Sequence, residues 1–303
     1  MNLVRTLLLS GYGLKLTTSG RTFRISSKDE KRDVSPADVD QILVSTSGVS
    51  ISSSAVRLAM DYGIEIVFLD GRGDWARLFL SSPVMTVETR KAQYSAILRG
   101  DKVGEEIVRS KVENQGGHLK YWGRQYGKLD DVRGLPEPQA ARLYWSSLGS
   151  LLPKELGFKG RDHDSPDQVN SSLNYMYALL YSACHRELSL VGLDPYAGFV
   201  HKDRSGKESL VYDFSEMFKP SAVDFPLWRA LLQGERFVVS QGLLDRESRR
   251  KLIALFNSAM EERVRDLTDS QTRTLRQHIR AYALKLGSYL RGERGFRGFV
   301  QSW

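Results

Sequence analysis

Short runs in which hydrophobic and polar residues alternate dominate the first eighty residues of the chain. Glycine and serine separate these runs, a pattern that is typical of strands joined by turns. The pattern changes over residues 52–62, where the apolar spacing predicts a helix that Gly63 ends. The expected strands are residues 3–10, 13–20, 21–27, 41–46, 48–52, 64–70 and 74–81.

From about residue 86 the apolar spacing becomes that of helices. A long charged helix is expected over residues 87–122. A later helix should begin with Ser165 as its cap, Pro166 in its first turn and Gln168 completing a capping box. Its apolar residues recur every three or four positions, which predicts a core helix: Leu173, Met176, Leu180, Cys184, Leu188 and Val191.

The remaining helices are expected over residues 222–235, 244–265 and 270–291. Residues 292–303 are expected to form a flexible basic tail. The sequence therefore predicts an α+β protein of two domains. A β-rich domain should span residues 1–83 and an all-helical domain residues 84–303, joined near residues 82–88.

The chain is basic, with a formal charge of +8 over 303 residues and an isoelectric point of about 9.5. This excess favours a polyanionic partner, nucleic acid ahead of an acidic membrane. Cys184 is the only cysteine, which excludes a disulfide within the chain and a cysteine-rich zinc site. A reducing compartment fits this composition. Because neither a secretory signal pattern nor a run of 18 apolar residues occurs, a cytoplasmic protein is expected.

Residues 198–218, GFVHKDRSGKESLVYDFSEMF, combine a histidine with two acids on one expected helix. Asp213 and Glu216 are three residues apart and therefore neighbours on that helix. Two carboxylates held together repel each other unless a cation lies between them. With the imidazole of His201, the donors suit Mg²⁺ or Mn²⁺. On spacing alone, the ordinary interpretation of a solvated acidic face beside a loop histidine stands ahead of a metal site.

Glu137 precedes an expected helix whose apolar stripe includes Tyr144. The same spacing, carried back, places Glu137 on the buried side, where a carboxylate needs a partner. An acid stabilised by the helix dipole explains this position equally well. Asp162, His163 and Asp164 also have ligand chemistry, but adjacent residues point in different directions and the segment lies in an expected loop.

Basic residues gather near these candidates and in two later helices. A basic stripe can follow the phosphates of a nucleic acid, and it is as often a solvated face. The candidate contacts are Lys202, Arg204 and Lys207 after His201, Arg246, Arg249 and Arg250 in the helix over 244–265, and Arg273, Arg276 and Arg280 on one face of the helix over 270–291.

Several segments together resemble one protein family, the CRISPR-associated adaptation integrases. The resemblance covers essentially the whole chain, and four ordered motifs make it specific. The matching segments are ISSSAVRLAMDYGIEIVFLD (51–70), ARLYW (141–145) preceded by Glu137, VNSSLNYMYALLY (169–181), LDPYAGFVH (193–201) and SLVYDFSEMFKP (209–220).

The resemblance implies a metal-dependent DNA endonuclease and integrase that acts in antiviral defence. Such proteins join the 3′-hydroxyl ends of a captured DNA fragment to a CRISPR repeat. It implies Glu137, His201 and Asp213 as catalytic ligands of Mg²⁺ or Mn²⁺. Glu216 is interpreted as a further acid that reaches the metal through water. Pro138 replaces the family's usual small residue and is expected to shift Glu137 to the helix cap.

The resemblance also implies a homodimer formed through the β-rich domain and a small second adaptation protein that bridges such dimers. Three alternatives remain open on the sequence: a transposon-encoded integrase relative, a non-catalytic basic DNA-binding module, and a membrane-surface protein. The amphipathic pattern of residues 270–291 is the only support for the membrane alternative.

Overall fold

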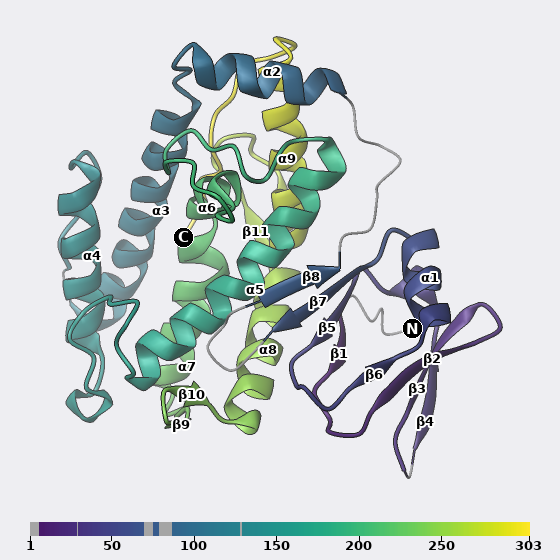
Figure 1. Cartoon of the computed structure of the whole chain (residues 1–303). Coiled ribbons are helices and arrows are strands. Elements are labelled where there is room, and N and C mark those ends of the chain that lie inside the picture. Colours follow the sequence, from purple (N-terminus) through teal and green to yellow (C-terminus); the bar gives the residue numbers. More distant parts are fainter. Residues whose placement is uncertain (1–5, 29, 70–74, 79–86, 128) are drawn as a thin grey trace. The chain divides into compact units, whose positions relative to one another are not determined.

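The computed structural model describes residues 6–28, 30–69, 75–78, 87–127 and 129–303 (Figure 1). The chain divides into two compact units, Met1–Pro83 and Val84–Trp303. Strands fill the first unit and helices the second, which confirms the predicted α+β class. Most of the predicted junction, residues 82–86, lies outside the described residues, as do residues 3–5, 74 and 79–81 of the strands expected at 3–10 and 74–81.

The described part of the first unit contains two four-stranded sheets. In one sheet the strands are parallel apart from the last, which runs antiparallel to its neighbour; in the other, three antiparallel strands are joined by one parallel strand. The first has the order β1 (Thr6–Leu9), β5 (Gln41–Val44), β7 (Glu65–Leu69) and β8 (Trp75–Leu78); the second has the order β4 (Lys31–Val34), β3 (Thr22–Ser26), β2 (Lys15–Ser19) and β6 (Ser50–Ile51).

The helix α1 (Ser53–Asp61) covers the core of this unit, as the apolar spacing predicts. Ser52 caps it, because its side chain accepts a hydrogen bond from the backbone N–H of Ala55. Ala55 and Ala59 are buried against a core that includes Phe23 and Ile42.

The second unit is helical with two short hairpins (Figure 1). Its α-helices are α2 (Val87–Leu98), α3 (Val103–Tyr126), α4 (Glu137–Leu151), α5 (Gln168–Val191), α6 (Ser209–Glu216), α7 (Phe225–Leu232), α8 (Arg246–Glu261) and α9 (Leu275–Leu290). The π-helix η3 (Pro220–Asp224) joins α6 to α7. Two short 3₁₀ turns are η1 (Pro36–Asp38), which lies in the first unit, and η2 (Lys154–Leu156). The hairpins pair β9 (Val239–Ser240) with β10 (Leu243–Leu244) and β11 (Arg263–Arg265) with β12 (Thr272–Thr274).

The helix α5 forms the centre of this unit and packs against α6, α8 and α9. Leu173, Leu180 and Leu188 of its predicted stripe have no exposed surface. Cys184 is equally buried, which confirms its place on the predicted core stripe. In the part of the chain that the structure describes, no helix is both long and apolar enough to cross a membrane.

Three predicted helix ends differ from the structure for local reasons. The helix expected over 87–122 is interrupted after Leu98, and Gly100 adopts a positive φ of 68°. Asp167, and not Ser165, caps α5, because its carboxylate accepts hydrogen bonds from two N–H groups of the first turn. The last helix begins at Leu275, where Thr274 makes the capping box.

The predicted flexible tail is wrong, because residues near Trp303 pack on α3. Phe299 is fully buried, and its carbonyl accepts hydrogen bonds from Ser110 Oγ and from Asn114 Nδ2 at 2.8 Å. The backbone N–H of Gln301 donates to Asn114 Oδ1 at 2.8 Å. The apolar residues of this segment therefore complete the core of the helical unit.

Candidate metal and nucleic-acid site

Glu137 is the first residue of α4, and Pro136 before it is the N-cap. The expectation that Pro138 shifts Glu137 to the cap is therefore wrong. Proline fits the first turn because the backbone N–H that it lacks would have no partner inside the helix there. The Glu137 carboxylate reaches α3, where its Oε1 lies 2.7 Å from Lys111 Nζ.

Glu216 is the last residue of α6 and contacts the same lysine from a different helix. Its Oε2 lies 2.9 Å from Lys111 Nζ, and its Oε1 lies 2.6 Å from Lys219 Nζ. Burial alone would raise the pKa of Glu216, but the ammonium groups of Lys219 and Lys111 lower that pKa to about 2. The acid therefore stays ionised at neutral pH.

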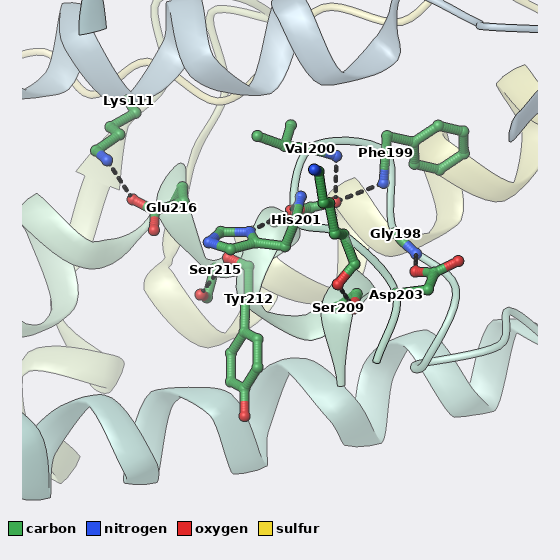
Figure 2. Close-up of polar contacts among 12 residues, drawn as sticks. Lys111, Gly198, Phe199, Val200, His201, Asp203, Ser209, Tyr212, Ser215 and Glu216 are labelled. Carbon is green, nitrogen blue, oxygen red and sulfur yellow. Dashed lines mark hydrogen bonds and ion pairs between the residues drawn. The ribbon is translucent and has the colours of Figure 1, made fainter. Parts of the chain in front are cut away.

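Asp213 lies one turn earlier in α6 and is fully buried. Its Oδ2 accepts hydrogen bonds from the backbone N–H groups of Phe199 at 2.6 Å and Val200 at 2.9 Å. Its Oδ1 accepts from the backbone N–H of His201 at 2.9 Å and lies 2.5 Å from His201 Nδ1 (Figure 2). Both carboxylate oxygens are therefore engaged by the loop 199–201.

The imidazole of His201 is oriented by this carboxylate. Nδ1 carries the proton toward Asp213, so the lone pair of Nε2 is available for a ligand. In Figure 2 the ring extends toward the side where Glu216 and Lys111 are drawn. The side chain is 46% exposed, so substrate and ions can reach it.

Gln93 of α2 holds the preceding part of the same loop. Its Nε2 donates to the carbonyls of Asp194 at 2.9 Å and Ala197 at 2.8 Å, and its Oε1 accepts from the Asp194 N–H at 2.8 Å. The amide is fully buried. The segment that carries His201 is thus fixed from two helices, by Gln93 on one side and Asp213 on the other.

Gly198 allows the loop to approach α6 closely, which makes a substitution there informative. A Cβ at this position would lie 2.8 Å from both Asp213 Oδ2 and Ser209 Cβ. We expect Gly198→Ala to move the loop and to lower the free energy of unfolding by roughly 1–3 kcal/mol. Gly295→Ala is the matched control, because an added Cβ there meets nothing. Thermal melts that coincide for the two variants would contradict this prediction.

A cavity of about 170 Å³ lies beside Glu216. Three cations line it, Lys111, Arg161 and Lys219, together with a second acid, Asp224. Lys219 also lies over the rings of two tyrosines that line the same cavity, at 5.0 and 5.3 Å from their centroids. The interior beside the acids is therefore polar and rich in positive charge.

Asp224 is held at the end of η3. The hydroxyl of Tyr177 donates to its carboxylate at 2.6 Å and that of Tyr144 at 2.8 Å. Burial raises the pKa of Asp224 to about 6, although both tyrosine hydrogen bonds act in the opposite direction. The π turn η3 begins at Pro220 and continues into α7.

The donors at this site fit a divalent cation. Within the described ranges, no group of three His, Cys, Asp or Glu side chains stands close enough to hold an ion. Glu137 and Glu216 meet instead on the ammonium of Lys111, so positive charge is what these acids require. Carboxylate oxygens and one imidazole nitrogen are the kinds of donor that suit Mg²⁺ or Mn²⁺, and in this arrangement the two glutamates converge while His201 is not yet within reach of the same ion. Glu137 also lines a larger cavity of about 740 Å³, which opens the site to ligands.

The basic residues after His201 are all exposed and share its loop: Lys202, Arg204 and Lys207. The next predicted group lies in the first two turns of α8: Arg246, Arg249 and Arg250. The predicted helix face of three arginines is wrong, because Arg273 lies in β12 and the helix begins two residues later. Arg273 pairs with Asp269 at 2.8 Å, Arg276 pairs with an acid at 2.9 Å, and Arg280 is exposed.

The less favoured group at residues 162–164 stays apart from the site. Its histidine, His163, is 82% exposed, and the neighbouring Asp164 is 97% exposed. Lys111, Lys219 and Gln93 are the site residues that the sequence did not reveal. Each is one polar residue among many in a helical segment, and only tertiary packing shows its partner.

The chain belongs to the family described as CRISPR associated protein Cas1, whose family model matches residues 7–134 and 125–258. A CRISPR-associated endonuclease Cas1 from Saccharolobus solfataricus is 48% identical over 302 residues, which cover 98% of each chain. A CRISPR-associated endonuclease Cas1 from Hyperthermus butylicus is 32% identical over 303 residues, which cover 89% of this chain and 90% of the relative. These findings confirm the resemblance seen in the sequence.

Solved structures share the fold. A casposase bound to integration product superposes with a TM-score of 0.85 at 23% identity, over 97% of this chain and 92% of that one. A Cas1 protein from Thermotoga maritima superposes with a TM-score of 0.82 at 20% identity, over 96% and 98% of the two chains. This chain therefore shares its fold with both proteins over nearly its whole length.

Proposed function

We propose that this chain is a metal-dependent DNA endonuclease and integrase that inserts short foreign DNA fragments into a CRISPR array. The observation that carries the proposal is the convergence of Glu137 and Glu216, from two helices, on one cation position beside an oriented histidine. Membership of the Cas1 family and the endonuclease names of the curated relatives support it.

The contacts favour Glu137, His201 and Glu216 as the residues that hold Mg²⁺ or Mn²⁺. Asp213, expected from the sequence to bind the metal directly, has both oxygens committed to the loop. We therefore assign Asp213 to positioning the imidazole, and Glu216 to direct ligation. This assignment reverses the roles that the sequence suggested for these two acids.

When bound, the metal would lower the pKa of an attacking hydroxyl and neutralise charge on the phosphate. The protein's own residues do the rest. Glu137 and Glu216 would fix the cation position, and the buried carboxylate of Asp213, in contact with Nδ1 of His201, orients the ring so that Nε2 is the nitrogen available to a metal. Lys219, paired with Glu216 and fixed over two tyrosine rings, keeps that acid ionised. In transesterification the 3′-oxygen of the fragment would form a bond to a phosphorus of the repeat strand, and the bond from that phosphorus to the strand's own 3′-oxygen would break. The attacking hydroxyl loses its proton, and the leaving 3′-oxygen gains one.

DNA is the proposed partner, and the basic charge of the chain supports it. Solved structures that share this fold include a TtCas1–DNA complex, with a TM-score of 0.62 at 17% identity, and a Cas6-RT-Cas1–Cas2 complex, of which this chain covers 36% at a TM-score of 0.75. We accordingly propose contacts with a captured fragment and a repeat, a homodimer through the β-rich unit, and Cas2 as the small second protein.

Two alternatives predict different behaviour. A transposon-encoded integrase would act without the small second protein; the 48% identity to a CRISPR-associated relative favours the CRISPR role. A non-catalytic basic module would bind DNA without changing it, and the paired acids beside an oriented histidine have no purpose in such a protein.

The test is strand transfer by the purified protein. A labelled fragment with free 3′-hydroxyl ends is mixed with duplex repeat DNA and Mg²⁺ or Mn²⁺, and the joined product is measured on a gel. We expect product only with the metal, and none after chelation. A fragment with 3′-deoxy ends is the control and should remain unjoined. DNA binding without any metal-dependent product would favour the non-catalytic module.

A further inference from the structure

Lys111 occupies an unusual position in the site. Its ammonium lies 2.7 Å from Glu137 Oε1 and 2.9 Å from Glu216 Oε2, and so joins the two acids that we propose as metal ligands. Its side chain is only 18% exposed. Lys219 differs, because its ion pair joins it to one acid, Glu216, three residues earlier in the same segment.

A divalent cation and the Lys111 ammonium cannot share these oxygens. Mg²⁺ binds carboxylate oxygen at about 2.0–2.1 Å, whereas an ammonium hydrogen bond needs about 2.7–2.9 Å. An ammonium that stayed in contact with both oxygens would lie against the metal, and two positive charges at such a separation repel strongly. Metal binding through Glu137 and Glu216 therefore requires Lys111 to move.

The structure also provides a place for the displaced side chain. Lys111 lines the cavity of about 170 Å³, whose walls include the carboxylate of Asp224. The side chain of lysine is a flexible four-carbon stem, so the ammonium can turn without movement of α3. Lys219 would stay, because it is fixed over the tyrosine rings and still balances Glu216.

We propose that Lys111 is an internal counter-cation, which holds Glu137 and Glu216 together in the metal-free protein and which the divalent cation displaces on binding. This inference rests on the proposed function. Lys111 stabilises the acid pair when no metal is present, because two carboxylates directed at one position would otherwise repel each other. It also competes with the metal, so it lowers the affinity of the site and excludes weakly bound ions.

The test measures Mn²⁺ binding to the full-length, metal-stripped protein by isothermal titration calorimetry, without DNA. Lys111→Met keeps an unbranched side chain one atom shorter and removes its charge. We expect Lys111→Met to bind Mn²⁺ on the order of tenfold more tightly than wild type. Its metal-free form should melt at a lower temperature, and saturating Mn²⁺ should raise that temperature by more than it does in wild type.

Lys120→Met is the matched control, because it removes the same charge from the exposed side of the same helix. Its Mn²⁺ affinity should equal that of wild type. If Lys111→Met fails to fold, Lys111→Arg tests the inference instead. A guanidinium forms more hydrogen bonds to two carboxylates than an ammonium does, so Mn²⁺ should bind this variant several-fold more weakly than wild type.

An unchanged or weakened Mn²⁺ affinity in Lys111→Met would overturn the inference, as would an unchanged or tightened affinity in Lys111→Arg. Failure of the proposed function gives a different result. In that case Glu137→Ala and Glu216→Ala would leave Mn²⁺ binding unchanged from that of wild type. The same would hold when Lys111 is also substituted.

Discussion

Glu216→Ala will reduce Mn²⁺-dependent strand transfer by more than the roughly 100-fold that marks the loss of a supporting partner. The reason is that Glu216 supplies an oxygen to the proposed cation position, whereas Asp213 acts on the metal only through His201. Asp213→Asn should therefore cost about 10- to 100-fold. Initial rates of strand transfer under saturating DNA and titrated Mn²⁺ separate the two effects.

Matched controls exist for each kind of side chain. Glu247→Ala removes an acid that is 68% exposed in α8, and His163→Ala removes an exposed imidazole, so both variants should retain full activity. His201→Ala should lose as much as Glu216→Ala. If Asp213→Asn proved more damaging to Mn²⁺ affinity than Glu216→Ala, the direct ligand would be Asp213, as the sequence first suggested.

Asn114→Ala will destabilise the helical unit by roughly 3 kcal/mol. Its amide donates to the carbonyls of Met217 at 3.0 Å and Phe299 at 2.8 Å and accepts from the Gln301 N–H. The Phe299 carbonyl keeps its bond from Ser110 Oγ, but the Met217 carbonyl and the Gln301 N–H lose this partner. Each such buried group costs about 1–3 kcal/mol. In a unit of this size the loss lowers the melting temperature by roughly 10 °C, which circular dichroism measures.

The control for Asn114→Ala is Asn257→Ala in α8. It makes the same change of side chain inside a helix, and among the described residues its amide forms no hydrogen bond. Its melting temperature should remain close to that of wild type. Equal melting temperatures for the two variants would mean that the bonds of Asn114 contribute nothing to stability.

The fold could be predicted where burial follows a regular period. The strand β5 and the helix α5 bury their apolar residues, so their spacing reveals them. The strand β4 was missed because three of its four residues are exposed. The β11–β12 hairpin was missed because its residues continue the apolar spacing of the flanking helices, and only its pairing across the turn distinguishes it.

Residue type and spacing could predict which residues belong to the site, but not what each of them contacts. His201, Asp213 and Glu216 fall within one short segment, and the family motifs added Glu137. The roles of the two acids on α6 could not be predicted. Residues three apart on a helix differ in direction, and packing decides that Asp213 meets the loop while Glu216 meets α3.

Two long-range contacts within the helical unit bear on how the protein folds. Gln93 bonds to residues about a hundred positions later, and Asn114 joins α3 to the backbone of Phe299 across 185 positions. Closing such long loops costs conformational entropy before the contacts can form, so regions of high contact order assemble late. The catalytic groups should therefore come together among the last steps of folding. A partly folded chain would hold DNA by its charge without being able to cut it.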